Sequence, residues 1–223
     1  MLTRELVAAA FPDPVADDRT AMPLMSSAEI DANRATTLAA VRPVDDIWLF
    51  AYGSLMWKPE PGFADQIPAV LEGWHRSFCI WQWRYRGTRE APGLMMALDV
   101  GGACVGAVLR APGPDAPSRL AGVWNREMIG RAYRPIWVEV ETGQGPVRAV
   151  TFVADRDSHR NAGDLPDETV AKYVARACGH IGPNAEYLLE TYLHCQKCGI
   201  GDPLLENLQG LVALGLEGQI SQL

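Results

Sequence analysis

An acidic residue stands where an amphipathic helix should carry an apolar one. Glu127 falls on the buried stripe of a helix predicted between Ser118 and Gly130, whose other members are Leu120, Val123, Trp124 and Met128. A carboxylate on the inward face of a helix is costly to bury unless it is paired or functional. Neighbouring apolar side chains that exclude water would raise its pKa, which suits a general base working near neutral pH.

A structural interpretation of Glu127 competes with this one. An ion pair with Arg126, Arg131 or Arg134, or a partly exposed position, would account for the same residue without catalysis. The residues alone do not separate the two interpretations.

The second candidate is the turn that ends an apolar run at residues 48–57. Strand-forming residues are followed at once by Gly53 and Ser54. Because glycine has no Cβ, backbone N–H groups in such a turn can approach a ligand and bind a carboxylate, although glycine is also common at ordinary strand ends. The residues assigned to this candidate substrate site are Leu49, Phe50, Ala51, Tyr52, Gly53, Ser54 and Leu55.

A cysteine pair near the C-terminus is the strongest competing signal. Cys195 and Cys198, preceded by His194, could bind zinc with His180 as a further ligand. Structural zinc sites usually show a second paired motif, and none is present, so two thiols near a helix end are the favoured interpretation. A Cys–His nucleophile using His75 has no local signature. The residues therefore predict no metal site.

The secondary structure that must position these residues is predicted to consist mainly of strands in the first part of the chain and of helices in the last part. Strands are predicted at residues 47–50, 67–71, 77–86, 93–99, 103–110, 136–141 and 147–155. Helices are predicted at residues 26–41, 118–130, 166–178, 184–198 and 202–214, with Asn184 as the cap of the fourth. Residues 100–102 predict a hairpin turn between two of the strands, and residues 142–146 predict another. This order indicates an α+β fold with a mixed or antiparallel sheet.

Residues 77–86 alternate in a way that admits two functions. Cys79, Trp81, Trp83 and Tyr85 are predicted to form one buried face of a strand. Aromatic residues interleaved with arginines could instead stack on nucleobases. The chain has 27 acidic and 20 basic residues, a net charge of −7, which argues against nucleic acid and anionic membranes as partners.

Residues 1–47 are predicted to be a helical arm separate from a domain at residues 48–223. Pro12 and Pro14 break the chain, and Ser26 and Glu29 fit a capping box. Pro43 and the pair Asp45-Asp46 end the helix that follows the box. The arm is expected to pack on the main domain, a disordered tail being the alternative. It offers no candidate chemistry.

Composition limits the class of protein further. Apolar residues make up 48% of the chain, yet no apolar run approaches the ~20 residues of a membrane span. The N-terminus lacks the features of a signal peptide. The five cysteines are an odd number and are expected to be reduced thiols in the cytoplasm. The sequence does not indicate an oligomeric state.

Several of these segments resemble one family. The run Phe50-Ala51-Tyr52-Gly53-Ser54-Leu55-Met56-Trp57 is similar to the Phe-x-Tyr-Gly-Ser-Leu-x-Trp loop of the ChaC branch of the γ-glutamylcyclotransferases, with Ala51 where many members have glycine. Residues 124–128 resemble the segment that holds the catalytic glutamate. Residues 86–93 resemble an Arg-Gly-Thr-x-Glu-x-Pro-Gly run, and residues 182–188 a Gly-x-Asn-x-Glu-Tyr-Leu run.

The resemblance implies a fold, an activity and residue roles. The fold would be a small β-barrel flanked by helices, and the substrate would be the small molecule glutathione, cleaved without a cofactor. Glu127 would be the base, residues 52–55 would hold the α-carboxylate, Arg86 would meet the glycine carboxylate, and Tyr187 would orient the substrate. Arg86 as a surface arginine and Tyr187 as a buried aromatic are the structural alternatives. Other γ-glutamyl compounds are the alternative substrates, and a non-catalytic or zinc-binding module is the alternative of another class.

Overall fold

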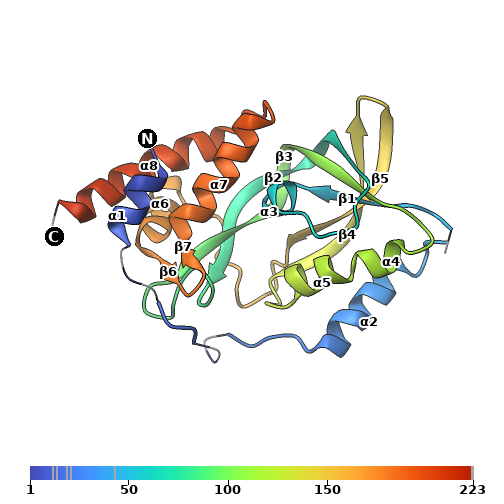
Figure 1. Ribbon diagram of the computed structural model, residues 1–223, viewed down its shortest axis with the longest axis horizontal. Helices are drawn as coiled ribbons and strands as arrows, with labels where there is room; N and C mark the ends of the chain where they lie inside the picture. Colours follow the sequence, from blue (N-terminus) through green and yellow to red (C-terminus); the bar gives the residue numbers. More distant parts are fainter. Residues whose placement is uncertain (12, 14, 19, 21, 43, 222–223) are drawn as a thin grey trace. The chain divides into compact units, whose positions relative to one another are not determined.

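The computed structural model describes residues 1–11, 13, 15–18, 20, 22–42 and 44–221. Pro12, Pro14 and Pro43, which were expected to break the arm, lie outside the described residues. The chain forms two compact units. The terminal unit comprises Met1–Met22, Ser77–Met96 and Arg160–Leu223, and the central unit comprises Pro23–Arg76 and Ala97–His159. Two long strands, β2 (Asp65–Gln82) and β3 (Gly93–Ala111), contribute residues to both units (Figure 1).

Five strands close into a barrel in the order β1, β3, β2, β4, β5, with a further pairing between β3 and β5. The short strand β1 (Ile47–Ala51) runs antiparallel to β3, from Ile47 opposite Ala111 to Ala51 opposite Ala107, and parallel to β5. The sheet is therefore mixed, and the predicted α+β barrel with flanking helices is confirmed.

The predicted turn at residues 142–146 is also confirmed. It joins β4 (Tyr133–Thr142) to β5 (Gly145–Ala154), which pair in register along their whole length. Gly145 adopts a φ of 109°, a conformation that side chains disfavour.

The predicted hairpin at residues 100–102 is wrong. Residues on both sides of Gly101 and Gly102 belong to the single strand β3. The two glycines have φ values of 115° and 63°, and the Gly101 carbonyl lies 3.1 Å from the Nδ1 atom of His75 on β2. The glycines bend the strand locally, as in β-bulges, without reversing it. The actual reversal lies at residues 83–92, between β2 and β3.

The predicted buried face of residues 77–86 is wrong as well. Strand β2 ends at Gln82, and Tyr85 turns the chain with a φ of 61°. Phe78 and Ile80, assigned to the other face, are buried, and Phe78 packs edge-on against Tyr187. Alternation failed here because both faces of this part of β2 are covered by other residues.

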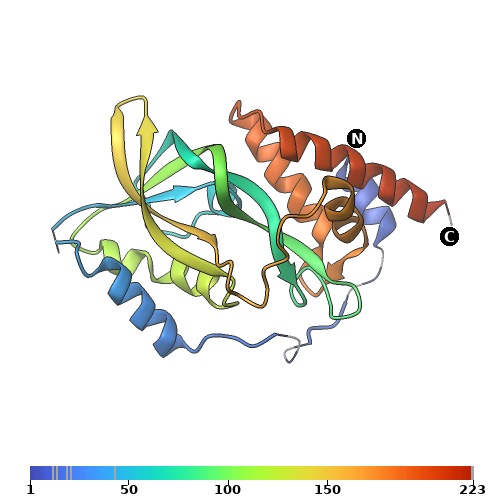
Figure 2. The ribbon, with the colours of Figure 1, turned by 180° about the vertical axis from the view of Figure 1, so that it is seen from behind.

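Four helices of the terminal unit lie side by side (Figures 1 and 2). They are α1 (Arg4–Ala10), α6 (Asp167–Arg176), α7 (Asn184–Lys197) and α8 (Pro203–Ile220), with the short strands β6 (Cys178–Gly179) and β7 (Gly182–Pro183) between α6 and α7. Helix α1 was not predicted, and α8 continues six residues beyond its predicted end at Leu214. Asp202 caps α8 by accepting a hydrogen bond from the Leu205 N–H.

The central unit carries the predicted capping box. Ser26 and Glu29 bond each other's backbone N–H groups at the start of α2 (Ser27–Leu38). Helix α2 packs against α5 (Ala121–Met128), which follows the single turn α4 (Ala116–Arg119) (Figure 2). The predicted helix after Ser118 is thus split in two at Leu120, whose side chain is buried.

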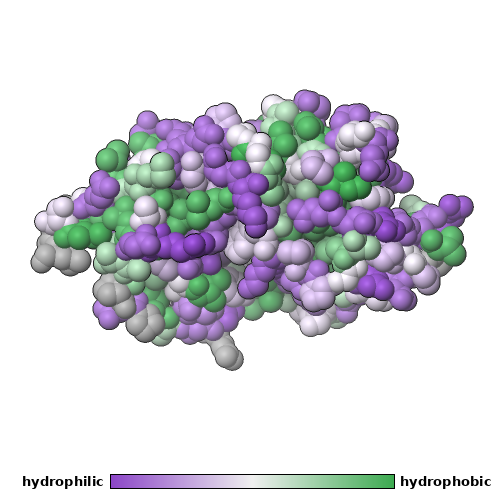
Figure 3. Space-filling model, turned by 45° about the horizontal axis from the view of Figure 1, so that its top comes forward, coloured by the Kyte–Doolittle hydropathy of each residue, from purple (hydrophilic) through white to green (hydrophobic). Residues whose placement is uncertain are grey.

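The surface mixes polar and apolar residues. On the face drawn in Figure 3, green apolar areas are broken up by purple polar ones. Exposed apolar side chains include Leu193 on α7 and Leu214 on α8. Within the described residues, no helix is long and apolar enough to span a membrane.

Candidate active site

Helix α5 is held rigidly on its apolar stripe. Val123, Trp124 and Met128 are buried as predicted. The Trp124 ring packs edge-on against Phe152 of β5 with ring centres 5.0 Å apart, and its indole N–H donates to Asn33 Oδ1 of α2 at 2.9 Å. Because the helix is fixed on the barrel side and on the α2 side, the position of Glu127 on it is well defined.

Glu127 is only 14% exposed, and no hydrogen bond to its carboxylate occurs among the described residues. Its nearest cation is Arg126, whose Nε lies 3.6 Å from Oε1. Arg126 also has other partners. Its Nη1 donates to the Lys58 carbonyl at 2.7 Å and lies 3.7 Å from Glu60 Oε1. Of the other cations considered for Glu127, Arg131 pairs with Glu29.

These surroundings give Glu127 an unusual acidity. Burial raises the pKa of Glu127 to about 7, the Arg126 charge acts in the opposite direction, and the Glu60 charge adds to the rise. At neutral pH the group can therefore both accept and return a proton, as a general base and acid must.

The turn after β1 supplies main-chain donors. Leu49, Phe50 and Ala51 are buried in the barrel, and the chain then passes through Tyr52 and Gly53 into a single helical turn, α3 (Ser54–Trp57). The first N–H groups of any helical turn have no partner within it. This local geometry leaves the amides that follow Tyr52 suited to an anionic group.

Tyr52 is fixed at both of its polar ends. Its hydroxyl donates to the Phe152 carbonyl at 2.7 Å, and its own carbonyl accepts from Arg76 Nε at 2.7 Å. Phe152 also supports Trp124 of α5, so one residue of β5 contacts both the Tyr52 turn and the helix of Glu127.

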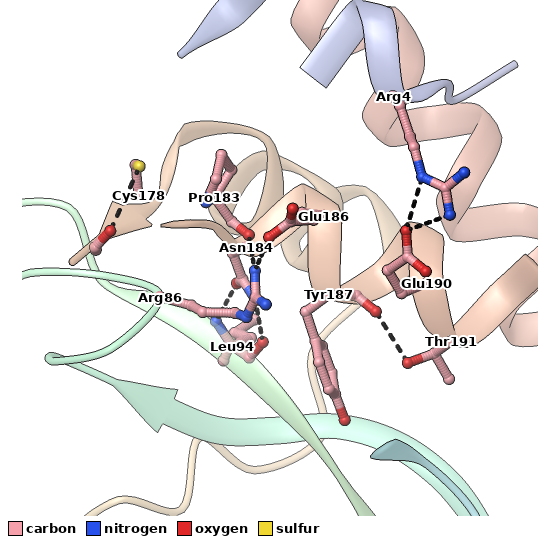
Figure 4. Close-up of polar contacts among 11 residues, drawn as sticks. Arg4, Arg86, Leu94, Cys178, Pro183, Asn184, Glu186, Tyr187, Glu190 and Thr191 are labelled. Carbon is pink, nitrogen blue, oxygen red and sulfur yellow. Dashed lines mark hydrogen bonds and ion pairs between the residues drawn. The ribbon is translucent and has the colours of Figure 1, made fainter. Parts of the chain in front are cut away.

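The segments at residues 86–93 and 182–188 lie together in the terminal unit (Figure 4). Arg86 Nη1 donates to the Pro183 carbonyl at 2.8 Å and to Glu186 Oε2 at 2.7 Å. Asn184 does not cap α7 as predicted. Instead, its buried side-chain amide accepts from the Leu94 N–H at 2.7 Å and donates to the Leu94 carbonyl at 2.9 Å, as a neighbouring strand would.

Tyr187 is buried in the same unit. It is 4% exposed and packs against Phe78 of β2. In Figure 4 its ring points away from the Arg86–Glu186 pair. The predicted contacts of Arg86 and Tyr187 with a substrate stay predictions.

Comparison with known proteins identifies the family. The family model of ChaC-like proteins matches residues 47–214. The glutathione-specific γ-glutamylcyclotransferase of Escherichia coli strain K12 is 36% identical over 186 residues, which cover 83% of this chain and 80% of that protein. The chain is a ChaC-like protein.

More distant relatives agree. Glutathione-specific γ-glutamylcyclotransferase 1 of Rattus norvegicus is 28% identical, with 69% of this chain and 71% of the relative covered. A crystal structure of a yeast γ-glutamyl cyclotransferase specific to glutathione superposes with a TM-score of 0.71 at 21% identity, covering 76% of this chain and 96% of that one. The structural likeness shows that the ChaC-like chain shares this fold.

The cysteine pair of this ChaC-like protein lies at the end of α7. Cys195 is buried, and the exposed Cys198 lies with its sulfur 3.3 Å from His194 Nε2. His180, considered as a further zinc ligand, lies 3.1 Å from Asp17 instead. Among the described residues, no group of three or more His, Cys, Asp or Glu side chains is arranged to hold a metal ion.

Sequence reasoning missed three residues that support the site. Asn33 bonds Trp124, Glu60 shares Arg126 with Glu127, and Arg76 bonds the Tyr52 carbonyl. None of the three lay within a predicted strand or carried a signal of its role, and Arg76, which directly precedes the strand predicted at residues 77–86, turns out to be 4% exposed.

Proposed function

We propose that this ChaC-like protein is a glutathione-specific γ-glutamylcyclotransferase. The reaction converts glutathione to 5-oxoproline and Cys-Gly. The α-amine of the γ-glutamyl group attacks its own γ-carbonyl, a five-membered lactam closes, and the amide bond to the cysteine nitrogen breaks. Relatives that carry this activity in their names support the proposal.

Glu127 is the observation that carries the proposal. The attacking amine is protonated near neutral pH, so a base must remove one proton before the lactam can close. A weakly paired carboxylate with a pKa near 7 can take this proton and then return it to the leaving nitrogen. The attacking nitrogen loses a second proton as the lactam forms, and the released amine of Cys-Gly takes up a proton in turn. Atoms and charge therefore balance without a metal, redox partner or covalent intermediate.

The Tyr52 turn would orient the reacting groups. Because nucleophile and carbonyl belong to one molecule, the enzyme's main task is to hold the γ-glutamyl group in a folded, near-attack shape. We assign the α-carboxylate to the main-chain N–H groups of residues 53–55. Arg86 and Tyr187 are proposed as further substrate contacts, Arg86 by exchanging Glu186 for the glycine carboxylate.

The runner-up function is the same chemistry on other γ-glutamyl compounds. Arg86 separates the two, because the second carboxylate of a γ-glutamyl amino acid lies one residue nearer the γ-carbonyl than the glycine carboxylate that Arg86 would bind. We place the reaction in the cytoplasm, where free thiols such as those of the five cysteines stay reduced.

The test is product formation. Purified protein is incubated with reduced glutathione and, separately, with γ-glutamyl-alanine, and 5-oxoproline is measured by chromatography. We expect 5-oxoproline and Cys-Gly from glutathione in equal amounts, at a higher kcat/KM than from γ-glutamyl-alanine. Comparable kcat/KM values would favour the runner-up, and absence of 5-oxoproline from both substrates would refute the proposed chemistry.

A further inference from the structure

Arg76 is a buried charged residue that donates hydrogen bonds to main-chain carbonyls. Its side chain on β2 is 4% exposed, its Nε donates to the Tyr52 carbonyl at 2.7 Å, and its Nη2 donates to the Val105 carbonyl at 2.6 Å. Burial of a guanidinium is costly unless its N–H groups are bonded, and here two main-chain carbonyls accept from it.

Both carbonyls lie where the pairing of β1 with β3 stops. The last paired residues are Ala51 and Ala107, so Tyr52 and Val105 are just beyond the ladder. The guanidinium joins the two strands at the point where their own hydrogen bonds end. It fixes the main chain at the first residue of the proposed substrate turn.

Gly106 allows the strands to approach this closely. A Cβ atom at position 106 would lie 2.4 Å from the Ala51 carbonyl oxygen and 2.8 Å from the Phe50 ring. Real Cβ atoms do not approach other atoms this closely, and the contact with the carbonyl oxygen could be relieved only by a shift of the main chain. Gly106 thus leaves room for the end of β1 to lie close to β3, and Arg76 holds the two strands together by hydrogen bonds.

The planarity of the peptide bond carries the effect to the turn. The Tyr52 carbonyl and the Gly53 N–H belong to one peptide group, and in a trans peptide they point in opposite directions. When Arg76 holds the carbonyl, the Gly53 N–H is directed away from Arg76. A positive charge on the carbonyl side also strengthens the N–H as a donor, because neighbouring hydrogen bonds polarise one another in a medium of low dielectric constant.

We propose that Arg76 is a positioning residue that orients and polarises the Gly53 amide for the α-carboxylate of the γ-glutamyl substrate. The inference rests on the proposed function, because it takes the Tyr52 turn to be the carboxylate site. Arg76 acts through the main chain of Tyr52 and does not itself touch the substrate.

The chain offers a matched control. Arg160 is also 4% exposed, and it donates from Nε and Nη2 to the Trp81 carbonyl of β2 at 2.9 Å and 2.8 Å. It therefore resembles Arg76 in burial and in acceptor type, but its carbonyl belongs to the terminal unit and not to the Tyr52 turn. Lysine keeps the charge in either position but has no planar fork with which to bond two groups.

The experiment compares Arg76→Lys with Arg160→Lys. We expect both to lower the melting temperature, whereas only Arg76→Lys raises KM for glutathione, by about tenfold, the scale of one weakened hydrogen bond to a charged group. The fall in kcat should be smaller, as for a contact made equally in the ground state and the transition state. An unchanged KM in Arg76→Lys, or an equal rise in Arg160→Lys, would overturn the inference.

A second measurement does not depend on the folding of these variants. Hydrogen exchange of the Gly53 amide is followed by NMR in Glu127→Gln protein, with and without glutathione. We expect the Gly53 amide to exchange more slowly with glutathione bound than without it. An amide that is equally protected in both states contradicts the proposed orientation. If the unmodified enzyme forms no 5-oxoproline, the proposed function fails as well, whereas an active enzyme with wild-type KM in Arg76→Lys rejects the role of Arg76 alone.

Discussion

Glu127 and Arg86 are charged side chains with almost the same burial, 14% and 13% exposed, but they are paired very differently. Arg86 lies 2.7 Å from Glu186 and 2.8 Å from the Pro183 carbonyl. Glu127 has one cation at 3.6 Å, and that cation is shared with Glu60. Burial with close pairing holds segments together, whereas burial without it shifts a pKa toward neutrality and leaves a group able to react.

The largest expected effect concerns Glu127, the weakly paired residue of the two. Glu127→Gln keeps the volume of the side chain but cannot accept the ammonium proton, so kcat should fall by about 10² to 10⁴, the usual contribution of a general base. Glu186→Gln is the matched control, because it removes a paired carboxylate, and its kcat should stay within a factor of about ten of the parent. Calorimetry with glutathione should show binding in both variants.

The same substitution should change the pH dependence of stability. In the unfolded chain Glu127 ionises near pH 4.5, but in the folded protein it keeps its proton up to about pH 7. The folded state binds more protons between these values, so this group makes the parent less stable as the pH rises through them. Denaturation curves of Glu127→Gln should lack that loss. If the free energy of unfolding changed with pH in the same way in both proteins, the raised pKa would be contradicted.

The next effect concerns the fully paired amide of Asn184. Asn184→Ala leaves the buried N–H and carbonyl of Leu94 without partners, which should lower the free energy of unfolding by about 3 kcal/mol. Gln196→Ala, at an exposed position of α7, is the control and should change it by less than about 0.5 kcal/mol. Urea denaturation measures both. A similar small change in both variants would show that the Asn184 pairing contributes little.

The next prediction tests whether Arg86, although closely paired, also binds the substrate. If it exchanges Glu186 for the glycine carboxylate, Arg86→Ala should raise KM for glutathione by about tenfold while changing kcat less. Glu186→Gln should then lower KM, because it removes the competing carboxylate. Steady-state kinetics on glutathione reports both. Unchanged KM in both variants would leave the pair as a purely structural contact.

The smallest effect is expected at Glu60. Its negative charge contributes to the raised pKa of Glu127, so Glu60→Gln should move the rising limb of the pH profile of kcat/KM to lower pH, by less than about 1 unit because burial is the larger cause. Glu72→Gln, at an exposed position on β2, is the control and should leave the profile in place. A shift to higher pH in Glu60→Gln would contradict the assigned electrostatics.

The predictable part of this protein is local in sequence. The stripe around Glu127, the capping box at Ser26 and the β4–β5 turn depend on residues within a few positions of one another, and all three were found from their spacing. The bend at Gly101 and the early end of β2 were not, because glycine pairs and aromatic alternation also fit other structures.

The support of the site could not be predicted because it depends on distant residues. Arg76 bonds carbonyls 24 and 29 positions away, and Asn33 bonds Trp124 91 positions away. No periodicity links such residues; only the closed barrel and the packing of α2 on α5 bring them together. The sequence assigned no chemistry to residues 1–47, but α2 of this segment supports the helix that carries Glu127. The boundary predicted between residues 47 and 48 stays a prediction.

The discontinuous course of the chain has a consequence for its synthesis on the ribosome. Helix α1 is made first, yet its packing partners α7 and α8 are made last. The central unit is complete once His159 has emerged, whereas the terminal unit must wait for its helices up to Ile220. Because chains generally fold as they emerge, the central unit can form first, and α1 remains without these partners until α7 and α8 have been made. A nascent chain stalled shortly after His159 has emerged should therefore already contain the folded surroundings of Glu127.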